Sequence, residues 1–162
     1  FSCVNKERAR NLILSLGIDK YLGIKNLADI VMCDDIIGIW SQLELVDEYP
    51  WLKSEKQLID KIREMLELDI NKYNVYKYGL YVSTVVGSIK GISYKEINNI
   101  YEELPIYSKK DINIRAIDIT NVLGIEPGNY ISDIYLDLEI KIINLEIDNE
   151  YGCLLEYIRN NY

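Results

Sequence analysis

The side chains that could do chemistry in this chain are mainly carboxylates, which occur in short clusters. Asp34-Asp35 is an adjacent pair, and Asp133 and Asp137 stand four residues apart. On a helix, a spacing of four puts both carboxylates on one face, where they could bind a cation. The solvated face of an acidic helix explains the same spacing, and we favour that interpretation. No metal ligand is therefore assigned.

Histidine does not occur among the 162 residues. Its absence excludes Ser-His-Asp catalysis, Cys-His catalysis and histidine-ligated zinc. Cys3, Cys33 and Cys153 are too widely spaced for a zinc or disulfide framework, so we expect free thiols in a reducing cytoplasm. The segment GSIKG lacks the Lys-Ser/Thr ending of a phosphate-binding loop. The sequence thus offers no recognisable catalytic centre.

Basic residues indicate a different kind of chemistry, which is contact with phosphates. The formal net charge of −8 argues against a broad affinity for nucleic acid, but the charge is unevenly distributed. Residues 1–25 hold five basic and two acidic side chains, and residues 88–115 hold five basic and four acidic ones. The second stretch predicts a local strip of phosphate-contacting side chains, formed by Lys90, Lys95, Lys109, Lys110 and Arg115. A solvated face is the alternative interpretation for any one of these lysines.

Helices are the elements expected to position these side chains, because apolar residues recur mostly at helical spacing. The periodic stretches are 4–16, 27–45, 58–66, 97–104, 131–145 and 154–158. Residues 75–86 suit either a strand or a buried helix, and we expect the helix. Ser54 with Gln57, and Ser93 with Glu96, are candidate capping boxes. The sequence therefore predicts an all-α protein, a bundle-like array of about seven or eight helices.

The clearest linker is the glycine-containing segment 87–93. It divides the chain into a helical body region, 1–87, and a C-terminal tail region, 88–162, which we expect to pack as one unit. No run approaches the roughly 20 apolar residues of a membrane span, so no membrane partner is expected. The chain begins at Phe1 without a methionine, and we expect it to be a piece of a longer protein.

An ordered set of motifs fills residues 104–158. Leu-Pro-Ile at 104–106 opens the set, Asp118-Ile119 follows, and Leu-Gly-Ile and Pro-Gly then occupy 123–125 and 127–128. Asn149-Glu150, the Leu154-Leu155 pair and Ile158 close it. This order resembles the C-terminal end of bacterial CCA-adding tRNA nucleotidyltransferases, the family that also contains bacterial poly(A) polymerases. One departure is Ala116, because the family usually has glycine two residues before the aspartate.

The resemblance implies that this chain is the body and tail of such an enzyme. In that family a catalytic head comes first, with a Gly-Ser pair and an Asp-x-Asp motif whose carboxylates hold two metal ions, followed by a Glu-Asp-x-x-Arg motif. This sequence contains no such set. The expected function is therefore non-catalytic: to hold the acceptor stem and elbow of tRNA by shape and backbone while the head adds nucleotides to the 3′ end. The expected partners are tRNA and the head of the same polypeptide, and Mg²⁺ is expected for the head alone.

The residues expected to form the site fall into two groups. The RNA-binding group consists of the five basic residues of 88–115 and Asn129, which stands beside a Pro-Gly turn at a predicted helix N-terminus. The structural group consists of residues expected to cap helices or to form turns, namely Asp118, Gly124, Pro127, Gly128, Asn149 and Glu150. Either Asp148 or Asn149 is expected to cap the last helix.

Two other functions stay open at this point. The acidic surface and the 14 tyrosines suit a protein-interaction module, including a homodimer. An independent enzyme that uses carboxylates is the third class.

Overall fold

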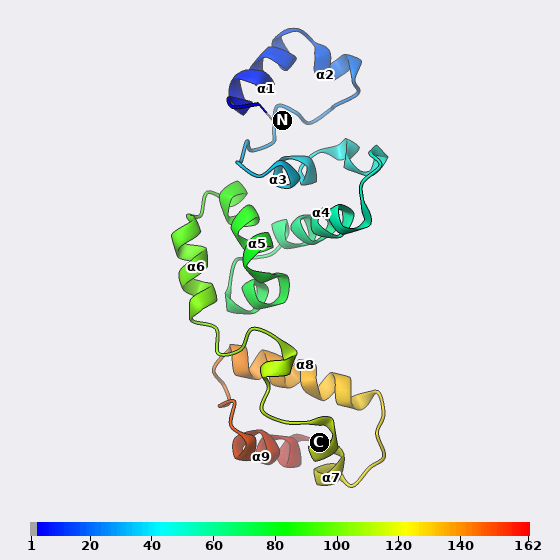
Figure 1. The fold of residues 1–162 in the computed structure, drawn as a ribbon, viewed down its shortest axis with the longest axis vertical. Helices are drawn as coiled ribbons and strands as arrows, with labels where there is room; N and C mark the ends of the chain where they lie inside the picture. The colour runs from blue at the N-terminus through cyan, green and yellow to red at the C-terminus, as the bar shows by residue number, and fades with distance from the viewer. Residues whose placement is uncertain (1–2) are drawn as a thin grey trace. The chain divides into compact units, whose positions relative to one another are not determined.

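The computed structural model describes residues 3–162, apart from the side chain of Val46. Within this range the chain forms nine α-helices and two short 3₁₀ helices and no strand, which confirms the predicted all-α class (Figure 1). The helices are α1 (Lys6–Ser15), α2 (Ile18–Tyr21), α3 (Ile36–Ser41), η1 (Glu44–Glu48), α4 (Lys53–Leu66), α5 (Lys72–Lys90), α6 (Tyr94–Glu102), η2 (Lys109–Asp111), α7 (Ala116–Leu123), α8 (Tyr130–Ile143) and α9 (Tyr151–Asn161).

These helices form two compact units. The first unit comprises the described residues up to 70 together with 78–98, and the second comprises 71–77 together with 99–162. Helices α5 and α6 therefore contribute to both units, and α5 contains a non-helical residue, Gly79, next to the change of unit between residues 77 and 78. The division into domains at residue 87 stays a prediction.

The first unit is built around two apolar clusters. One joins α4 to α5 through Ile62, Met65, Tyr78, Val82, Val85 and Val86. The other is formed by Leu27, Ile30, Cys33, Ile39 and Leu43, and α3 packs on α4. In the first cluster, the spacing of three and four residues along α4 and α5 produces the apolar faces. Full burial of a valine, isoleucine or methionine side chain contributes about 1.5–3 kcal/mol.

The predicted helix over 27–45 is mostly wrong, because only Ile36–Ser41 is α-helical within it. The carboxylate of Asp35 accepts the Gly38 N–H at 2.9 Å and so starts α3 there. The preceding segment is irregular and is held by Asn26, whose amide donates to the Gln42 carbonyl at 2.7 Å. Leu27, Ile30 and Cys33 of this segment are buried, as they would be on one face of a helix. They lie in a loop instead, so their spacing was misleading.

Helix boundaries depend on capping groups, and of the two capping boxes that the sequence predicted, one is confirmed and one is wrong. The box of Ser93 and Glu96 is confirmed: Ser93 Oγ accepts the Glu96 N–H at 3.3 Å, and Glu96 accepts the Ser93 N–H at 3.0 Å. Ser54 does not cap α4, because the helix begins at Lys53 and Glu55 accepts the N–H of Leu52. The expected linker 87–93 is largely the last turn of α5, which ends at Lys90.

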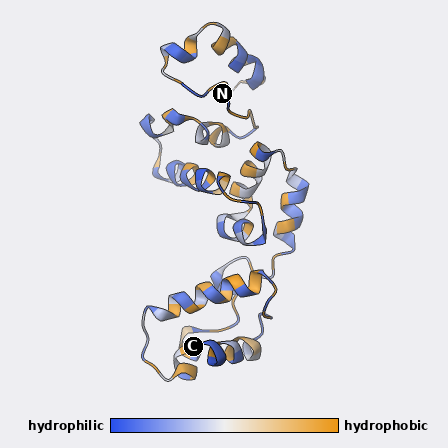
Figure 2. Cartoon of the chain, turned by 180° about the vertical axis from the view of Figure 1, so that it is seen from behind, coloured by the Kyte–Doolittle hydropathy of each residue, from blue (hydrophilic) through white to orange (hydrophobic). Residues whose placement is uncertain are grey.

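The core of the second unit joins α7, α8 and α9. Helix α7 packs against α9, and Figure 2 shows hydrophobic residues along most of α8. The fully buried side chains include Ile119, Ile134, Leu138, Ile142, Leu154 and Ile158. Three of these residues, Ile134, Leu138 and Ile142, repeat every four residues along α8, which explains why the predicted helix over 131–145 is confirmed.

The turn between α7 and α8 contains the Leu-Gly-Ile and Pro-Gly motifs. Gly124 has φ +67°, and its N–H donates to the Thr120 carbonyl at 2.8 Å, so it ends α7 in the left-handed conformation. Gly128 does not have a positive φ. Helix α8 begins at Tyr130, directly after Asn129, as the sequence predicted.

Two further findings concern the described residues. None of the described helices has both the length and the apolar character that crossing a membrane requires. Cys33 is buried, Cys3 and Cys153 are exposed, and all three are free thiols.

The two glycines Gly124 and Gly152 allow a matched test of the turn. A Cβ added at either position meets no atom within 4 Å, but only Gly124 has a positive φ. We expect Gly124→Ala to lower the free energy of unfolding by about 1 kcal/mol, because L-residues are strained there. Gly152→Ala, inside α9, should raise it by about 0.5–1 kcal/mol. Urea unfolding of both variants measures this, and equal effects would contradict the assignment of the turn.

Candidate nucleic-acid interface

The segment 107–115 of the second unit carries three of the predicted cations, and its regular structure is limited to the short 3₁₀ helix η2. Its first part is fixed by Asp111, whose Oδ2 accepts the N–H of Tyr107 at 2.9 Å and the N–H of Ser108 at 2.8 Å. The Ser108 hydroxyl donates to the same oxygen at 3.2 Å. These bonds, first that from Tyr107, lower the pKa of Asp111. The segment is called the cationic loop below.

The second part of the cationic loop is held from α8 and from the α8–α9 connection. Asn149 accepts the Asn113 N–H at 2.9 Å and donates its amide to the Asp111 carbonyl at 2.8 Å. The Tyr135 hydroxyl of α8 donates to the Ile114 carbonyl at 2.9 Å. Side chains distant in sequence thus satisfy the backbone groups that a helix would have paired internally.

The three cations of this loop lie at its surface. Lys109 Nζ is 4.6 Å from the centre of the Tyr135 ring, which is a cation–π contact. Lys110 is exposed, and the Arg115 side chain is 80% exposed. The loop therefore carries Lys109, Lys110 and Arg115 at the surface of one ordered segment.

Asp118 holds Arg115 at the start of α7. Its Oδ2 accepts the backbone N–H and the Nε–H of Arg115, each at 3.1 Å, and Oδ1 accepts from Nη2 at 3.3 Å. Asp118 is only 8% exposed, and the hydrogen bonds from Arg115 lower the pKa of its carboxyl group. The expected capping role of Asp118 is therefore present, and the same carboxylate also orients a cation.

The other predicted site residues lie elsewhere. Lys90 and Lys95 belong to the first unit, where Lys90 Nζ donates to the Leu68 carbonyl and Lys95 is exposed on α6. Asn129 is the exposed N-cap residue of α8, and its side chain makes no capping bond. Pro127 lies exposed in the turn before it. Whether any of these residues binds RNA stays a prediction.

The closing Asn-Glu motif has a different role from the expected one. Helix α9 begins after Glu150, so neither Asp148 nor Asn149 is its N-cap residue. Asn149 instead holds the cationic loop, a function that depends on a residue 36 positions away in the chain. The sequence pattern marked the residue but gave no sign of its partner.

Several residues that form or contact the cationic loop were not identified from the sequence. Ser108 and Asp111 have the spacing of a capping box, which was a usable signal. Tyr135 and Tyr151 gave no such signal, because their contacts with the loop arise only from the packing of α8 and α9.

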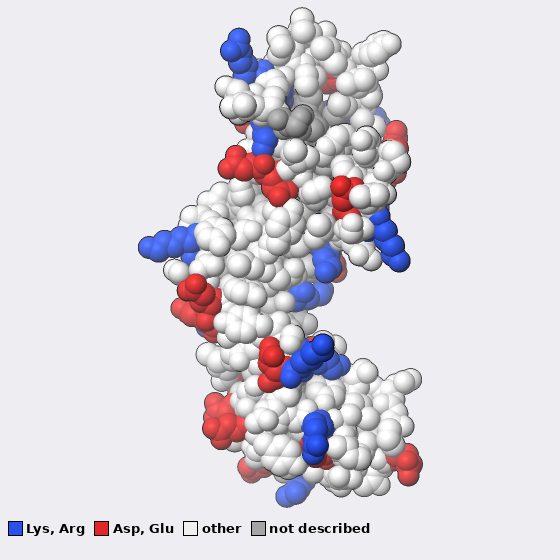
Figure 3. Space-filling view, in the orientation of Figure 1, with Lys and Arg blue, Asp and Glu red and all other residues white. Residues whose placement is uncertain are grey.

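Figure 3 shows Lys and Arg side chains of the second unit interspersed with carboxylates on the face in view.

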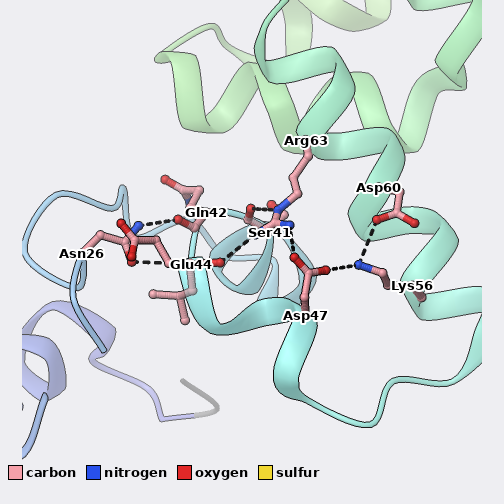
Figure 4. Close-up of polar contacts among 9 residues, drawn as sticks. Asn26, Ser41, Gln42, Glu44, Asp47, Lys56, Asp60 and Arg63 are labelled. Atoms are coloured by element: carbon pink, nitrogen blue, oxygen red, sulfur yellow. Dashed lines mark hydrogen bonds and ion pairs between the residues drawn. The ribbon is translucent and has the colours of Figure 1, made fainter. Parts of the chain in front are cut away.

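The first unit also contains a dense polar network, which is structural (Figure 4). Arg63 donates Nε to the Ser41 carbonyl at 3.0 Å, Nη2 to the Leu43 carbonyl at 2.8 Å and Nη1 to Asp47 at 2.9 Å. Lys56 pairs with Asp47 and with Asp60. These hydrogen bonds tie α4 to the end of α3, and the cations are already neutralised by carboxylates.

The acidic clusters do not form a metal site in the described part of the chain. No group of three or more His, Cys, Asp or Glu side chains is arranged there to hold an ion. Asp137, expected on a solvated face, accepts hydrogen bonds from Tyr157 at 2.7 Å and Tyr162 at 3.0 Å. Burial and these bonds raise the pKa of each tyrosine to about 12.

Comparison with known proteins gives the following relatives. A family model described as tRNA nucleotidyltransferase domain 2 matches residues 51–158. A CCA-adding enzyme of Bacillus cereus is 24% identical over 123 residues, which cover 67% of this chain and 31% of that protein. A CCA-adding enzyme of Ligilactobacillus salivarius is 30% identical over 103 residues, which cover 60% of this chain and 25% of that protein. The chain thus matches about a third or less of these relatives' length.

One solved structure is similar in fold. The crystal structure of Bacillus stearothermophilus CCA-adding enzyme in complex with CTP matches with a TM-score of 0.64 and 14% identity. The match covers 78% of this chain and 38% of that chain. At this identity the likeness concerns the fold alone.

The bond between Arg115 and Asp118 predicts a dependence of stability on pH. Because the native pKa of Asp118 lies below its usual value of 3.8, the pair stabilises the fold above that pH and is lost as pH falls through the native pKa. We expect Asp118→Asn to be less stable than the wild type at neutral pH, with a difference that shrinks in acid. Urea unfolding from about pH 7 to about pH 3 measures it.

The control for this series is Glu156→Gln, which changes an exposed carboxylate of α9. Its stability should follow that of the wild type at every pH. A constant difference between the wild type and Asp118→Asn would show that the charge of Asp118 is not what stabilises the pair.

Proposed function

Because the chain belongs to the tRNA nucleotidyltransferase family, through domain 2 of that family, we propose that it is the part that binds tRNA and performs no catalysis. The observation that carries the proposal is the cationic loop, where Lys109, Lys110 and Arg115 are exposed on a backbone that side chains hold in place. Such a segment can meet phosphates without first losing conformational entropy on binding.

The mode of binding proposed is recognition of shape and backbone. An enzyme that adds nucleotides to every tRNA cannot depend on base sequence, and duplex RNA is recognised mainly through its phosphates and 2′-hydroxyls. Arginine and lysine suit that task, since phosphate contacts position a protein without reading bases. The whole chain has a net charge of −8 although the loop itself is positive, so the rest of the chain is acidic and would limit binding away from the loop.

The catalytic part is proposed to lie in a head of the same polypeptide, because the chain matches about a third or less of its relatives. Mg²⁺ would belong to that head, and the described residues of this chain do not form a cluster suited to hold it. A cytoplasmic location, expected from the sequence, stays a prediction, and so does a homodimer. The choice between CCA addition and poly(A) synthesis would lie in the head.

The role of the two lysines can be tested by the salt dependence of tRNA binding. We expect Lys109→Ala/Lys110→Ala to weaken binding and to reduce the slope of log K against log salt by about 0.9 for each duplex phosphate that these lysines neutralise. The control, Lys53→Ala/Lys61→Ala, removes two exposed lysines from α4. Fluorescence anisotropy with full-length tRNA measures both. Equal slopes for the two double variants would contradict the proposed interface.

The absence of catalysis is tested separately. With tRNA lacking its CCA end, CTP, ATP and Mg²⁺, we expect the chain to incorporate no labelled nucleotide, because the proposal assigns transfer to the head. Incorporation above a no-protein control would overturn the non-catalytic assignment.

A further inference from the structure

A small pocket lies where the cationic loop meets the first turns of α7 and α9. Its volume is about 290 Å³, and it is lined by Ile112, Asn113, Ile114, Arg115, Asp118 and Tyr151. Ile112 and Ile114 are each 5% exposed and anchor the loop in the core. Asn113, which stands between them, therefore projects from a backbone that is anchored on both sides.

Arg115 presents unused donors at this pocket. A guanidinium has five N–H donors, and Asp118 takes one from Nε and one from Nη2. The remaining donors, on Nη1 and the outer side of Nη2, form the edge that matches two oxygens of a phosphate. Because the inner edge is bonded to a buried carboxylate, the outer edge is held in one orientation.

Asn113 and Tyr151 supply the other chemistry of the pocket. The backbone of Asn113 is fixed by Asn149, and its exposed side-chain amide offers both a donor and an acceptor. Tyr151, the first residue of α9, is 46% exposed and provides an aromatic surface. One pocket is thus lined by N–H donors that suit a phosphate, an amide that can pair with a hydroxyl, and an aromatic ring. These groups belong to Arg115, Asn113 and Tyr151.

We propose that this pocket binds one ribose-phosphate unit of an RNA strand. Arg115 contacts the phosphate, Asn113 the 2′-hydroxyl, and Tyr151 packs against the sugar or its base. Asp118 is a positioning residue, since it acts through Arg115. This inference rests on the proposed function and adds to it one pocket, the unit of the RNA strand that the pocket binds and the residues that recognise that unit.

The size of the pocket favours a strand over a free nucleotide. Sites for small molecules usually have about 300–1,000 Å³ and enclose most of the ligand. A pocket at or below the low end of that range can take part of a nucleotide whose remainder continues as polymer. Its exposed arginine also suits a phosphate that stays partly in solvent.

The experiment compares Arg115→Ala, Arg115→Lys and Asn113→Ala with the control Arg159→Ala. Arg159 is an exposed arginine of α9, so its removal changes the charge of the same unit equally. Binding is measured by anisotropy with full-length tRNA, and with a hairpin of one sequence made in RNA and in DNA, over a range of salt. CMP and AMP are added as competitors, and circular dichroism verifies that each variant is folded.

We expect Arg115→Ala to bind tRNA about tenfold more weakly and to reduce the salt slope by about 0.9, because a charged hydrogen bond to a phosphate is removed. Arg115→Lys should bind almost as weakly, since lysine lacks the planar fork. Asn113→Ala should weaken binding to the RNA hairpin several-fold and leave the DNA hairpin unchanged, because only RNA has the 2′-hydroxyl. Arg159→Ala should change little.

The outcomes separate this inference from the proposed function. If wild-type protein binds tRNA but Arg115→Ala behaves as Arg159→Ala, the pocket is not the phosphate site, and the proposed function stands. If Asn113→Ala weakens RNA and DNA alike, the recognition of ribose is wrong. Competition by CMP or AMP at concentrations near those of RNA would assign the pocket to a free nucleotide instead. No binding of tRNA by the wild type would overturn both.

Discussion

The second unit depends on one constraint: a segment of backbone that is neither helix nor strand must still have its polar groups satisfied. Asp111, Tyr135 and Asn149 supply partners for the cationic loop, and Asp118 does so at its end. The bonds made by Tyr135 and Asp118 are part-buried, and an unpaired buried backbone group costs about as much as a lost hydrogen bond. The bonds made by Asp111 and Asn149 lie at the surface and add further order to the loop. The placement of α8 and α9 is what brings two of them, Tyr135 and Asn149, into reach.

Two of the side chains that pair the backbone of the cationic loop also hold cations that we propose bind RNA. The cations of the loop are exposed, yet Lys109 lies over the Tyr135 ring and Arg115 is bonded to Asp118. Arg115 shows this most clearly, since its side chain is 80% exposed while its partner Asp118 is 8% exposed. In contrast, Arg63 of the first unit directs its guanidinium to two backbone carbonyls and one carboxylate. Two arginines of one protein thus differ in exposure and partners: Arg115 keeps donors free at the surface, whereas Arg63 links backbone carbonyls to a carboxylate.

The sequence predicted the elements whose apolar residues repeat regularly, and it failed where local polar groups decide. Helix α8 was predicted because Ile134, Leu138 and Ile142 lie on one face. The segment 27–35 was mistaken for helix because its leucine and isoleucine spacing is similar, although Asp35 and Asn26 organise it as a loop. For the site, the sequence marked Asp118 and Asn149, but the partner of Asn149 lies far away in the chain and could not be deduced from spacing.

The central claim is that the cationic loop and the start of α9 are where this protein meets tRNA. Amide shifts in two-dimensional ¹⁵N NMR, recorded while tRNA is added, test it most directly, because they report on every residue at once. The account predicts that the largest changes fall on residues 107–118 and on Tyr151 and saturate with tRNA. Changes that spare this segment and concentrate elsewhere, for example on α1 and α2, would contradict it.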